Sequence, residues 1–196
     1  MTALDLSSDV GLAALYLLTV NLLLGLLLSV RYSPWRQWPH RRINYFVWHN
    51  WSGYIALFLC VLHPILILPS STAHFGWIDL VYPVGAPKQP WINTLGAAGL
   101  YLLAVVVVTS YYRREIGRAP WKIIHYLAYA VAILSYVHGI LTDPTLTDKA
   151  VDFLDGEKVS VELCLVLALA ATAVRMHGRW RRYALARERG ELPRAA

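Results

Sequence analysis

Histidine is the residue type in this sequence with the most evident chemistry. Four of the seven histidines fall inside long apolar segments, His49 and His63 in one segment and His125 and His138 in another. An ionisable side chain at membrane depth is costly, and its presence there suggests a function. A neutral imidazole can bind a transition metal or the iron of a haem through one ring nitrogen. The four histidines therefore predict ligand chemistry inside an apolar environment.

The spacing of these histidines arranges them in two pairs. His63 follows His49 by 14 residues, and His138 follows His125 by 13. In two parallel helices that rise about 1.5 Å per residue, this spacing puts two histidines at each of two depths, on the order of 20 Å apart. Two imidazoles at one depth suit axial ligation of a haem from both faces. We therefore expect one haem between His49 and His125 and a second between His63 and His138.

Other interpretations of the histidines remain open. A proton relay or a structural histidine needs no cofactor, and a transition-metal transporter could also use paired histidines, usually with carboxylates or thiols added. Small residues accompany the histidines at three- and four-residue spacing, a pattern that close helix packing in membranes also produces. These residues are Ser52, Gly53, Ala56 and Cys60 in one segment and Ala128, Ala132, Ser135 and Gly139 in the other. A histidine-lined metal or proton transporter without haem is therefore the alternative function.

The elements that must position the histidines are apolar helices. Hydrophobic residues make up 57% of the chain and charged residues 15%, outside the usual soluble range. Five stretches are long enough to cross a bilayer core, which takes about 20 residues of helix. They cover residues 10–30, 45–68, 91–110, 121–141 and 159–174. We expect an all-α integral membrane protein, with a bundle of five transmembrane helices over residues 1–182 and a basic tail over 183–196.

Lysine and arginine are distributed unevenly between the connecting segments. Of the eighteen, fifteen follow the first, third or fifth apolar stretch, and only Lys88, Lys149 and Lys158 lie in the other two loops. The positive-inside rule then predicts an N-terminus outside and a C-terminus in the cytoplasm. We expect a multi-pass protein of the cell (plasma or inner) membrane, surrounded by lipid. His49 and His125 would lie near its cytoplasmic side, and the other pair near its outer side.

Basic residues beside the inner histidines are candidates to neutralise haem propionates. They are Arg41, Arg42, Arg118 and Lys122, all in loops that we expect on the cytoplasmic side. Positive-inside topology alone also explains each of them. On the outer side, His74, Lys88, Lys149 and Lys158 could have the same role.

The segment 177–189 alternates arginines with Trp180, Tyr183 and Leu185. This pattern is typical of an interfacial helix held by anionic lipid headgroups. A docking surface for a cytoplasmic partner would have the same composition.

Two motifs that the sequence lacks restrict the cofactors. Without a Cys-x-x-Cys-His motif, any haem is held without covalent attachment. No Gly-x-Gly-x-x-Gly follows a strand, and no soluble segment is long enough for a nucleotide-binding unit. We therefore expect no flavin or NAD(P)H site in this chain and no nucleic-acid partner. If a nicotinamide or flavin is the electron source, another polypeptide must bind it.

Two segments resemble the ferric reductase-like transmembrane domain, a family of NADPH oxidases, ferric reductases and the haem-binding subunit of bacterial methionine sulfoxide reductase. They are YFVWHNWSGY (45–54) with His63, and WKIIHYLAY (121–129) with His138. The similarity covers about residues 10–182, and the 14- and 13-residue spacings are typical of it. The resemblance implies an inner b-type haem on His49 and His125, an outer one on His63 and His138, and electron flow from the cytoplasmic side outward.

Two features set this sequence apart from the oxidases of that family. The flavin and NADPH module that eukaryotic members fuse to the bundle is missing, and Ile67 stands where oxidases place a polar residue one turn after the outer histidine. The resemblance therefore implies an oxidoreductase component that works as an electron conduit. Its donor would be a separate cytoplasmic flavin reductase or a membrane quinol, and its acceptor would be extracytoplasmic.

Overall fold

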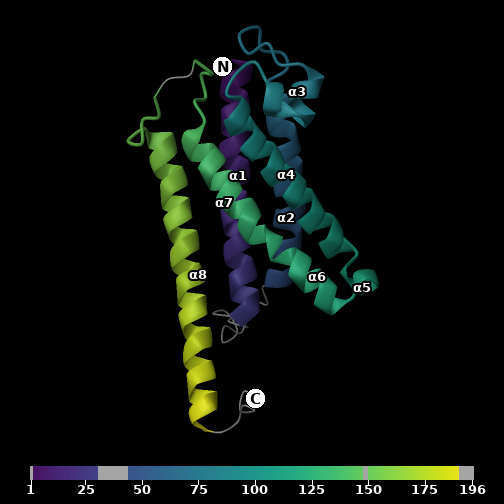
Figure 1. Ribbon diagram of the computed structural model, residues 1–196, viewed down its shortest axis with the longest axis vertical. Coiled ribbons are helices and arrows are strands. Elements are labelled where there is room, and N and C mark those ends of the chain that lie inside the picture. Colours follow the sequence, from purple (N-terminus) through teal and green to yellow (C-terminus); the bar gives the residue numbers. More distant parts are fainter. Residues whose placement is uncertain (1, 31–43, 148–149, 190–196) are drawn as a thin grey trace.

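The chain folds into a bundle of long helices (Figure 1). The computed structural model describes residues 2–30, 44–147 and 150–189, and no strand occurs in these ranges. Five helical segments are long and apolar enough to cross a membrane. They are α1 (Ala3–Val30), α2 (Tyr45–Ile65), α4 (Pro90–Tyr111), α6 (Arg118–His125) together with α7 (Leu127–Leu141), and α8 (Gly156–Glu188). The predicted all-α membrane fold with five spans is confirmed.

Local capping decides where the first two helices begin. Thr2 and Asp5 exchange hydrogen bonds, with Thr2 N–H donating to Asp5 Oδ2 (2.7 Å) and Asp5 N–H donating to Thr2 Oγ1 (3.2 Å). These bonds satisfy backbone donors at the helix start, so α1 begins seven residues before the predicted span. The side chain of Asn44 accepts from Val47 N–H at the start of α2. That helix ends just after Pro64, three residues before the predicted end.

The central helix is α1, which packs on α2, α7 and α8, while α4 packs on α7 and α2 (Figure 1). Leu15, Tyr136 and Val161 meet in the buried cluster that joins α1, α7 and α8. On the other side of α1, Asn21 Nδ2 donates to Ser52 Oγ at 2.9 Å. Ser52 is one of the small residues that accompany the α2 histidines, so this part of the stripe serves close helix packing.

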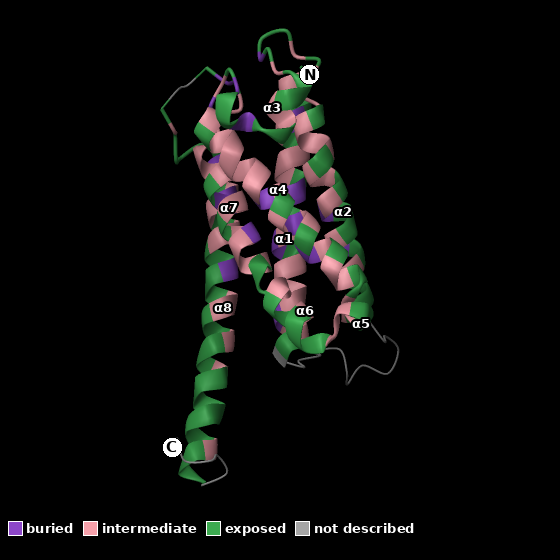
Figure 2. Cartoon of the chain, turned by 45° about the vertical axis from the view of Figure 1, so that its right-hand side comes forward, coloured by how far each residue is buried: buried purple, intermediate pink, exposed green. Residues whose placement is uncertain are grey.

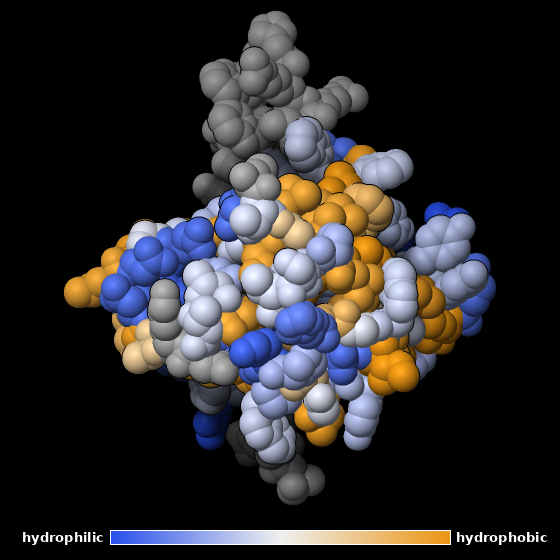
Figure 3. Space-filling model, turned by 90° about the horizontal axis from the view of Figure 1, so that it is seen from above, coloured by the Kyte–Doolittle hydropathy of each residue, from blue (hydrophilic) through white to orange (hydrophobic). Residues whose placement is uncertain are grey.

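Large apolar side chains cover much of the outside of the bundle. Trp48, Trp51 and Phe58 on α2 are each more than 60% exposed, and exposed residues line the outer faces of the other spans as well (Figure 2). Seen from the N-terminal end, hydrophobic side chains also reach the sides of the molecule, with hydrophilic ones gathered between them (Figure 3). Such a surface is stable in lipid, where apolar side chains need no cover.

The loops at the N-terminal end are tied to one another and to the bundle. This end carries the short helices α3 (Trp77–Val81) and η1 (Pro83–Gly85). Gln89 bonds the opposite loop twice, donating from Nε2 to Asp143 O (3.3 Å) and accepting from Asp143 N–H (3.2 Å). Tyr101 of α4 donates its hydroxyl to Val81 O. The loop between α2 and α4 therefore folds back over this end of the bundle.

The fourth span is divided at Tyr126, which separates α6 from α7. Tyr126 N–H bonds the carbonyls of both Lys122 and Ile123, and Tyr129 N–H bonds Tyr126 O three residues back. These are the tight bonds of a 3₁₀ turn, whereas a π-bulge would widen the helix. The 13-residue spacing between His125 and His138 therefore runs across a tight turn between α6 and α7.

The opposite end of the molecule carries α5 (Arg113–Ile116) and the long extension of α8. The helix α8 continues without interruption from Gly156 to Glu188 and projects past the other helices (Figure 1). Trp180 and Tyr183 lie exposed on this projection. The proposed tail boundary at residue 183 therefore falls inside a helix, and the structure has no break there.

Candidate cofactor site

The four histidines lie in two facing pairs within the bundle. The ring centroids of His49 (α2) and His125 (α6) are 6.0 Å apart, with 74° between the ring planes. Those of His63 (α2) and His138 (α7) are 6.3 Å apart, with 73° between the planes. The structure therefore brings together the same residues that the sequence pairs by depth.

The spacing of each pair fits two imidazoles that share one metal ion. A metal–imidazole bond is about 2.0 Å long, and a ring nitrogen lies about 1.15 Å from its ring centroid, so two rings on opposite sides of one metal have centroids about 6.3 Å apart. The observed 6.0 and 6.3 Å agree with this value. Edge-to-face contacts between rings have centroids about 4.5–7 Å apart, so the separation is consistent with a shared metal ion and does not require one.

The helix α1 orients the two histidines of α2. His49 Nδ1 lies 3.0 Å from Asn21 O, and His63 Nδ1 lies 2.7 Å from Ser7 O. The same two α1 residues bond the backbone of these histidines, because Asn21 Nδ2 donates to His49 O (2.5 Å) and Ser7 Oγ donates to His63 O (2.8 Å). Each α2 histidine is thus held both at its ring and at its carbonyl by one residue of α1.

The helix α4 orients the other two histidines. His138 Nδ1 lies 2.8 Å from Ile92 O. His125 Nδ1 instead lies 3.2 Å from Ser110 Oγ, which also accepts from Trp121 Nε1 at 3.2 Å. The Trp121 ring stacks on the His125 imidazole with 5.0 Å between centroids. His125 is therefore held by a hydroxyl and an aromatic face, whereas His138 is held by a backbone carbonyl.

These bonds determine which ring nitrogen is available as a ligand. A carbonyl oxygen only accepts, so Nδ1 of His49, His63 and His138 must carry the proton. The neutral ring then keeps an unprotonated Nε2, and Nε2 is left free for a metal. At His125 the Ser110 hydroxyl has a second lone pair beside the one used by Trp121, and it can accept from Nδ1 in the same way.

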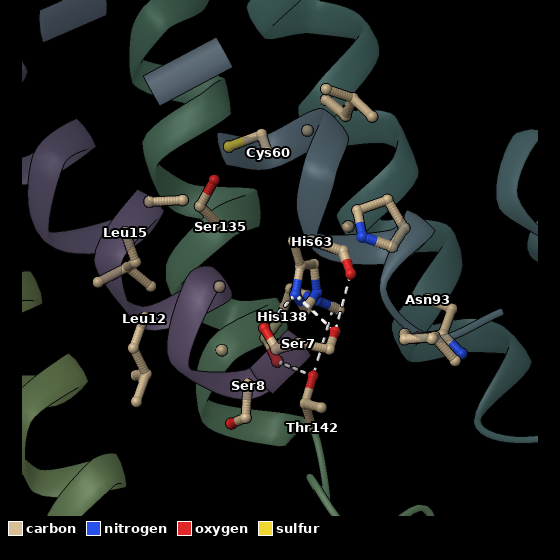
Figure 4. Close-up of a pocket in the computed structure, with 18 of the residues that line it drawn as sticks. Ser7, Ser8, Leu12, Leu15, Cys60, His63, Asn93, Ser135, His138 and Thr142 are labelled. Atoms are coloured by element: carbon tan, nitrogen blue, oxygen red, sulfur yellow. Dashed lines mark hydrogen bonds between the residues drawn. The ribbon is translucent and has the colours of Figure 1, made fainter. Parts of the chain in front are cut away.

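The surroundings of the His63–His138 pair are largely apolar. A cavity beside the pair is lined by residues of all five spans, including Leu12, Leu100, Leu103 and Val161. Figure 4 shows the two imidazoles side by side, with Ser7 and Thr142 next to them and Cys60 and Ser135 further along. A flat hydrophobic group with two axial ligands fits this combination of apolar walls and paired imidazoles.

No group of three or more His, Cys, Asp or Glu side chains able to hold a metal ion occurs in the described ranges 2–30, 44–147 and 150–189. Each ligand set is thus a pair of imidazoles. Two axial ligands on a macrocycle that supplies four more donors make a complete set. The chemistry of the donors therefore fits haem.

The basic residues proposed for propionates are only partly placed. Arg118 and Lys122 are exposed on α6, and Lys122 Nζ lies 6.0 Å from the centroid of the Tyr126 ring. Arg41 and Arg42 lie outside the described residues. A propionate role for these four residues stays a prediction. Lys158 is buried, and its ammonium group donates to Gly139 O (2.9 Å) and Thr142 O.

Sequence reasoning missed the residues that orient the imidazoles. Ser7 and Asn21 on α1, with Ile92 and Ser110 on α4, come from spans that contain no histidine. Ser7, Asn21 and Ile92 contact Nδ1 through backbone carbonyls, which every residue has, so the contact itself leaves no side-chain signal in the sequence. A signal is nevertheless present: Ser7 and Asn21 are 14 residues apart, the spacing of the histidines that they hold.

Comparison with known proteins links this chain to one family. The model of the ferric reductase like transmembrane component matches residues 10–136. The matched range includes His49, His63 and His125 and ends two residues before His138. No curated protein and no solved structure gave a match.

Proposed function

Because this chain belongs to the ferric reductase-like transmembrane component family, and so has a role in transmembrane electron transfer, we propose that it is a di-haem b-type membrane cytochrome. His49 and His125 hold the inner haem, and His63 and His138 hold the outer one. The observation that carries the proposal is the pair of centroid separations, 6.0 and 6.3 Å, at two levels of one bundle.

Contacts within the chain orient the four imidazoles without a bound cofactor. The carbonyls of Asn21, Ser7 and Ile92 accept the Nδ1 proton and leave Nε2 unprotonated. Each ring is already held by a contact at Nδ1, so little rotational freedom is lost when a metal binds. The largely apolar walls around His63 and His138 favour a hydrophobic macrocycle.

Haem iron, when bound, supplies one-electron exchange between its ferric and ferrous states. The two imidazoles of each pair would hold the haem through Nε2, and a haem so held would supply electron transfer without binding oxygen or another small ligand. This arrangement suits an electron conduit that works with a donor on one side and an acceptor on the other.

The donor in this proposal is a separate cytoplasmic flavin reductase or a membrane quinol, and the acceptor is extracytoplasmic. The proposal places α6 and the projecting part of α8 on the cytoplasmic side, in the cell membrane. Support comes from the distribution of basic residues: seven arginines from Arg175 onward follow the last span.

Haem content and the reduced absorption spectrum of the purified protein test this function. The protein should contain two haem equivalents with bis-imidazole spectra. His125→Ala should remove the haem held with His49 and leave the other, and His138→Ala should do the reverse. Loss of one ligand removes one axial bond and leaves Nε2 of its partner unpaired, so about one equivalent should be lost in each variant.

His177→Ala is the matched control, because His177 is exposed on the projecting part of α8. This variant should keep both equivalents. A correctly folded protein that binds no haem would overturn the proposal and favour the histidine-lined transporter. Two equivalents retained in both His125→Ala and His138→Ala would show that haem binds elsewhere.

A further inference from the structure

Three glycines lie directly against the histidine rings. A Cβ atom added at Gly11 would lie 2.9 Å from His63 Nδ1, and one added at Gly96 would lie 2.9 Å from His138 Cε1. At Gly25 the added atom would lie 3.2 Å from His49 Cε1. Contacts this short force a ring or a helix to move. Any side chain at these three positions would therefore displace an imidazole.

Each glycine stands four residues after the carbonyl that its histidine uses. Gly11 follows Ser7, Gly25 follows Asn21, and Gly96 follows Ile92. In an α-helix the carbonyl of one residue points at the N–H four residues later, and the side chains of these two residues lie on one face. A missing Cβ at the later residue opens the second lone pair of that carbonyl to a group approaching from the side.

At the fourth histidine, His125, a serine takes the place of the glycine. Gly11 and Gly25 are 14 residues apart on α1, and the residue 14 positions after Gly96 on α4 is Ser110. Ser110 therefore stands where a fourth glycine would stand. Its own hydroxyl is the partner of His125 Nδ1, at 3.2 Å, and is shared with Trp121 Nε1. A shared hydroxyl accepts more weakly than a carbonyl at 2.7–3.0 Å.

We propose that Gly11, Gly25 and Gly96 are positioning residues: because they have no side chain, a backbone carbonyl can reach Nδ1 of His63, His49 and His138. In the same proposal, Ser110 makes His125 the least electron-donating of the four ligands. The inference rests on the proposed haem function. A stronger acceptor at Nδ1 makes Nε2 a better donor, and a better donor stabilises the ferric state. The chain would thus tune its two haems unequally, with two carbonyls behind the His63–His138 pair and one behind the His49–His125 pair.

Redox titration of Ser110 variants tests the tuning. Ser110→Ala removes the acceptor at His125 Nδ1, so the midpoint potential of the His49–His125 haem should shift upward while the other haem is unchanged. Ser110→Thr keeps a hydroxyl and should restore the wild-type potential. The single-haem proteins His125→Ala and His138→Ala identify which potential belongs to which haem.

Glycine substitutions test the positioning. Gly25→Ala should reduce occupancy or shift the spectrum of the His49–His125 haem only, and Gly11→Ala and Gly96→Ala should do so for the other haem only. Alanine favours helix more than glycine does, so a loss cannot come from a weaker helix. Gly178→Ala on α8 is the control, because an added Cβ there meets nothing within 4 Å.

The outcomes separate the two proposals. Wild-type protein without haem defeats the proposed function itself. Wild-type protein with two haems, combined with unchanged spectra and potentials in the three glycine variants and in Ser110→Ala, overturns the present inference alone. Equal disturbance of both haems by Gly11→Ala and by Gly25→Ala would also overturn it, since it would show that these glycines serve general packing of α1 on α2. If the glycine variants do not fold, the shift in Ser110→Ala and its reversal in Ser110→Thr still decide the tuning.

Discussion

At the scale of single residues, Lys158 is the buried charge nearest to the proposed outer site. It is 8% exposed, and its ammonium group donates to Gly139 O and Thr142 O at the end of α7. The last carbonyls of a helix lack partners inside it and carry partial negative charge. Lys158 therefore satisfies the end of the helix that carries His138, and its charge lies beside the His63–His138 cavity.

Replacing Lys158 with methionine should affect both stability and redox behaviour. The two carbonyls lose their partner, which should lower the free energy of unfolding by about 1–3 kcal/mol. The lost positive charge should also lower the midpoint potential of the His63–His138 haem, because a nearby cation favours the reduced state. Thermal unfolding in detergent and redox titration measure the two effects.

Arg114→Met is the control for Lys158→Met, since Arg114 is exposed on α5 at the other end of the bundle. It should change neither quantity. An unchanged potential in Lys158→Met would show that the lysine acts on the helix end alone.

At the scale of elements, the division of the fourth span sets the direction of His138. A straight helix turns about 100° per residue, so a 13-residue spacing leaves the second histidine about 140° away from the face of the first. The turn at Tyr126 interrupts the regular helix between α6 and α7, so the rotation of a straight helix does not apply across the whole span. His125 and His138 can therefore both face α2.

Insertion of one alanine after Tyr126 tests the importance of this break. The insertion makes the spacing 14 residues, the value found in α2, but it turns α7 by about 100° relative to α6. We expect loss of the His63–His138 haem and retention of the His49–His125 haem, measured as haem equivalents per protein.

An alanine inserted between Ala150 and Val151 is the matched control, because it lengthens a loop between α7 and α8. Both haems should remain there. Two haems in the Tyr126 insertion would mean that the spacing is not critical and that α7 rotates freely to accommodate it.

At the scale of the whole molecule, the bundle has two chemically different ends. One end is covered by α3, η1 and the loop that Gln89 ties to Asp143. The other end carries α5, α6 and the arginine-rich extension of α8 (Figure 1). Unequal charge between the ends predicts a fixed orientation, with the arginine-rich end in the cytoplasm.

Labelling with a membrane-impermeant maleimide in intact cells measures this orientation. In a background with Cys60 and Cys164 replaced by alanine, Ser71→Cys should be labelled, because it lies exposed in the loop after α2. Ala184→Cys on the projecting part of α8 should be labelled only after the cells are opened. The reverse pattern would invert the proposed direction of electron flow.

The sequence alone determined the number of spans and predicted which four histidines lie in pairs. Both follow from composition along a single segment: about 20 apolar residues make a span, and a histidine inside one is rare enough to mark a site. The 14- and 13-residue spacings also predicted the pairing by depth, because rise per residue is nearly constant in a helix. Helix ends were predicted less well at α1 and α2. The start of α1 depends on a local hydrogen bond to Asp5, and α2 ends just after Pro64.

Only the tertiary structure decided how each imidazole is oriented. The partners of Nδ1 come from α1 and α4. Three of them are backbone carbonyls, which no side-chain type in the sequence indicates. The same holds for the 3₁₀ turn at Tyr126, since α4 and α1, on which α7 packs, select the direction in which α7 must face. Rise along a helix is a local property that one segment contains, whereas rotation about its axis is meaningful only relative to the neighbouring helices.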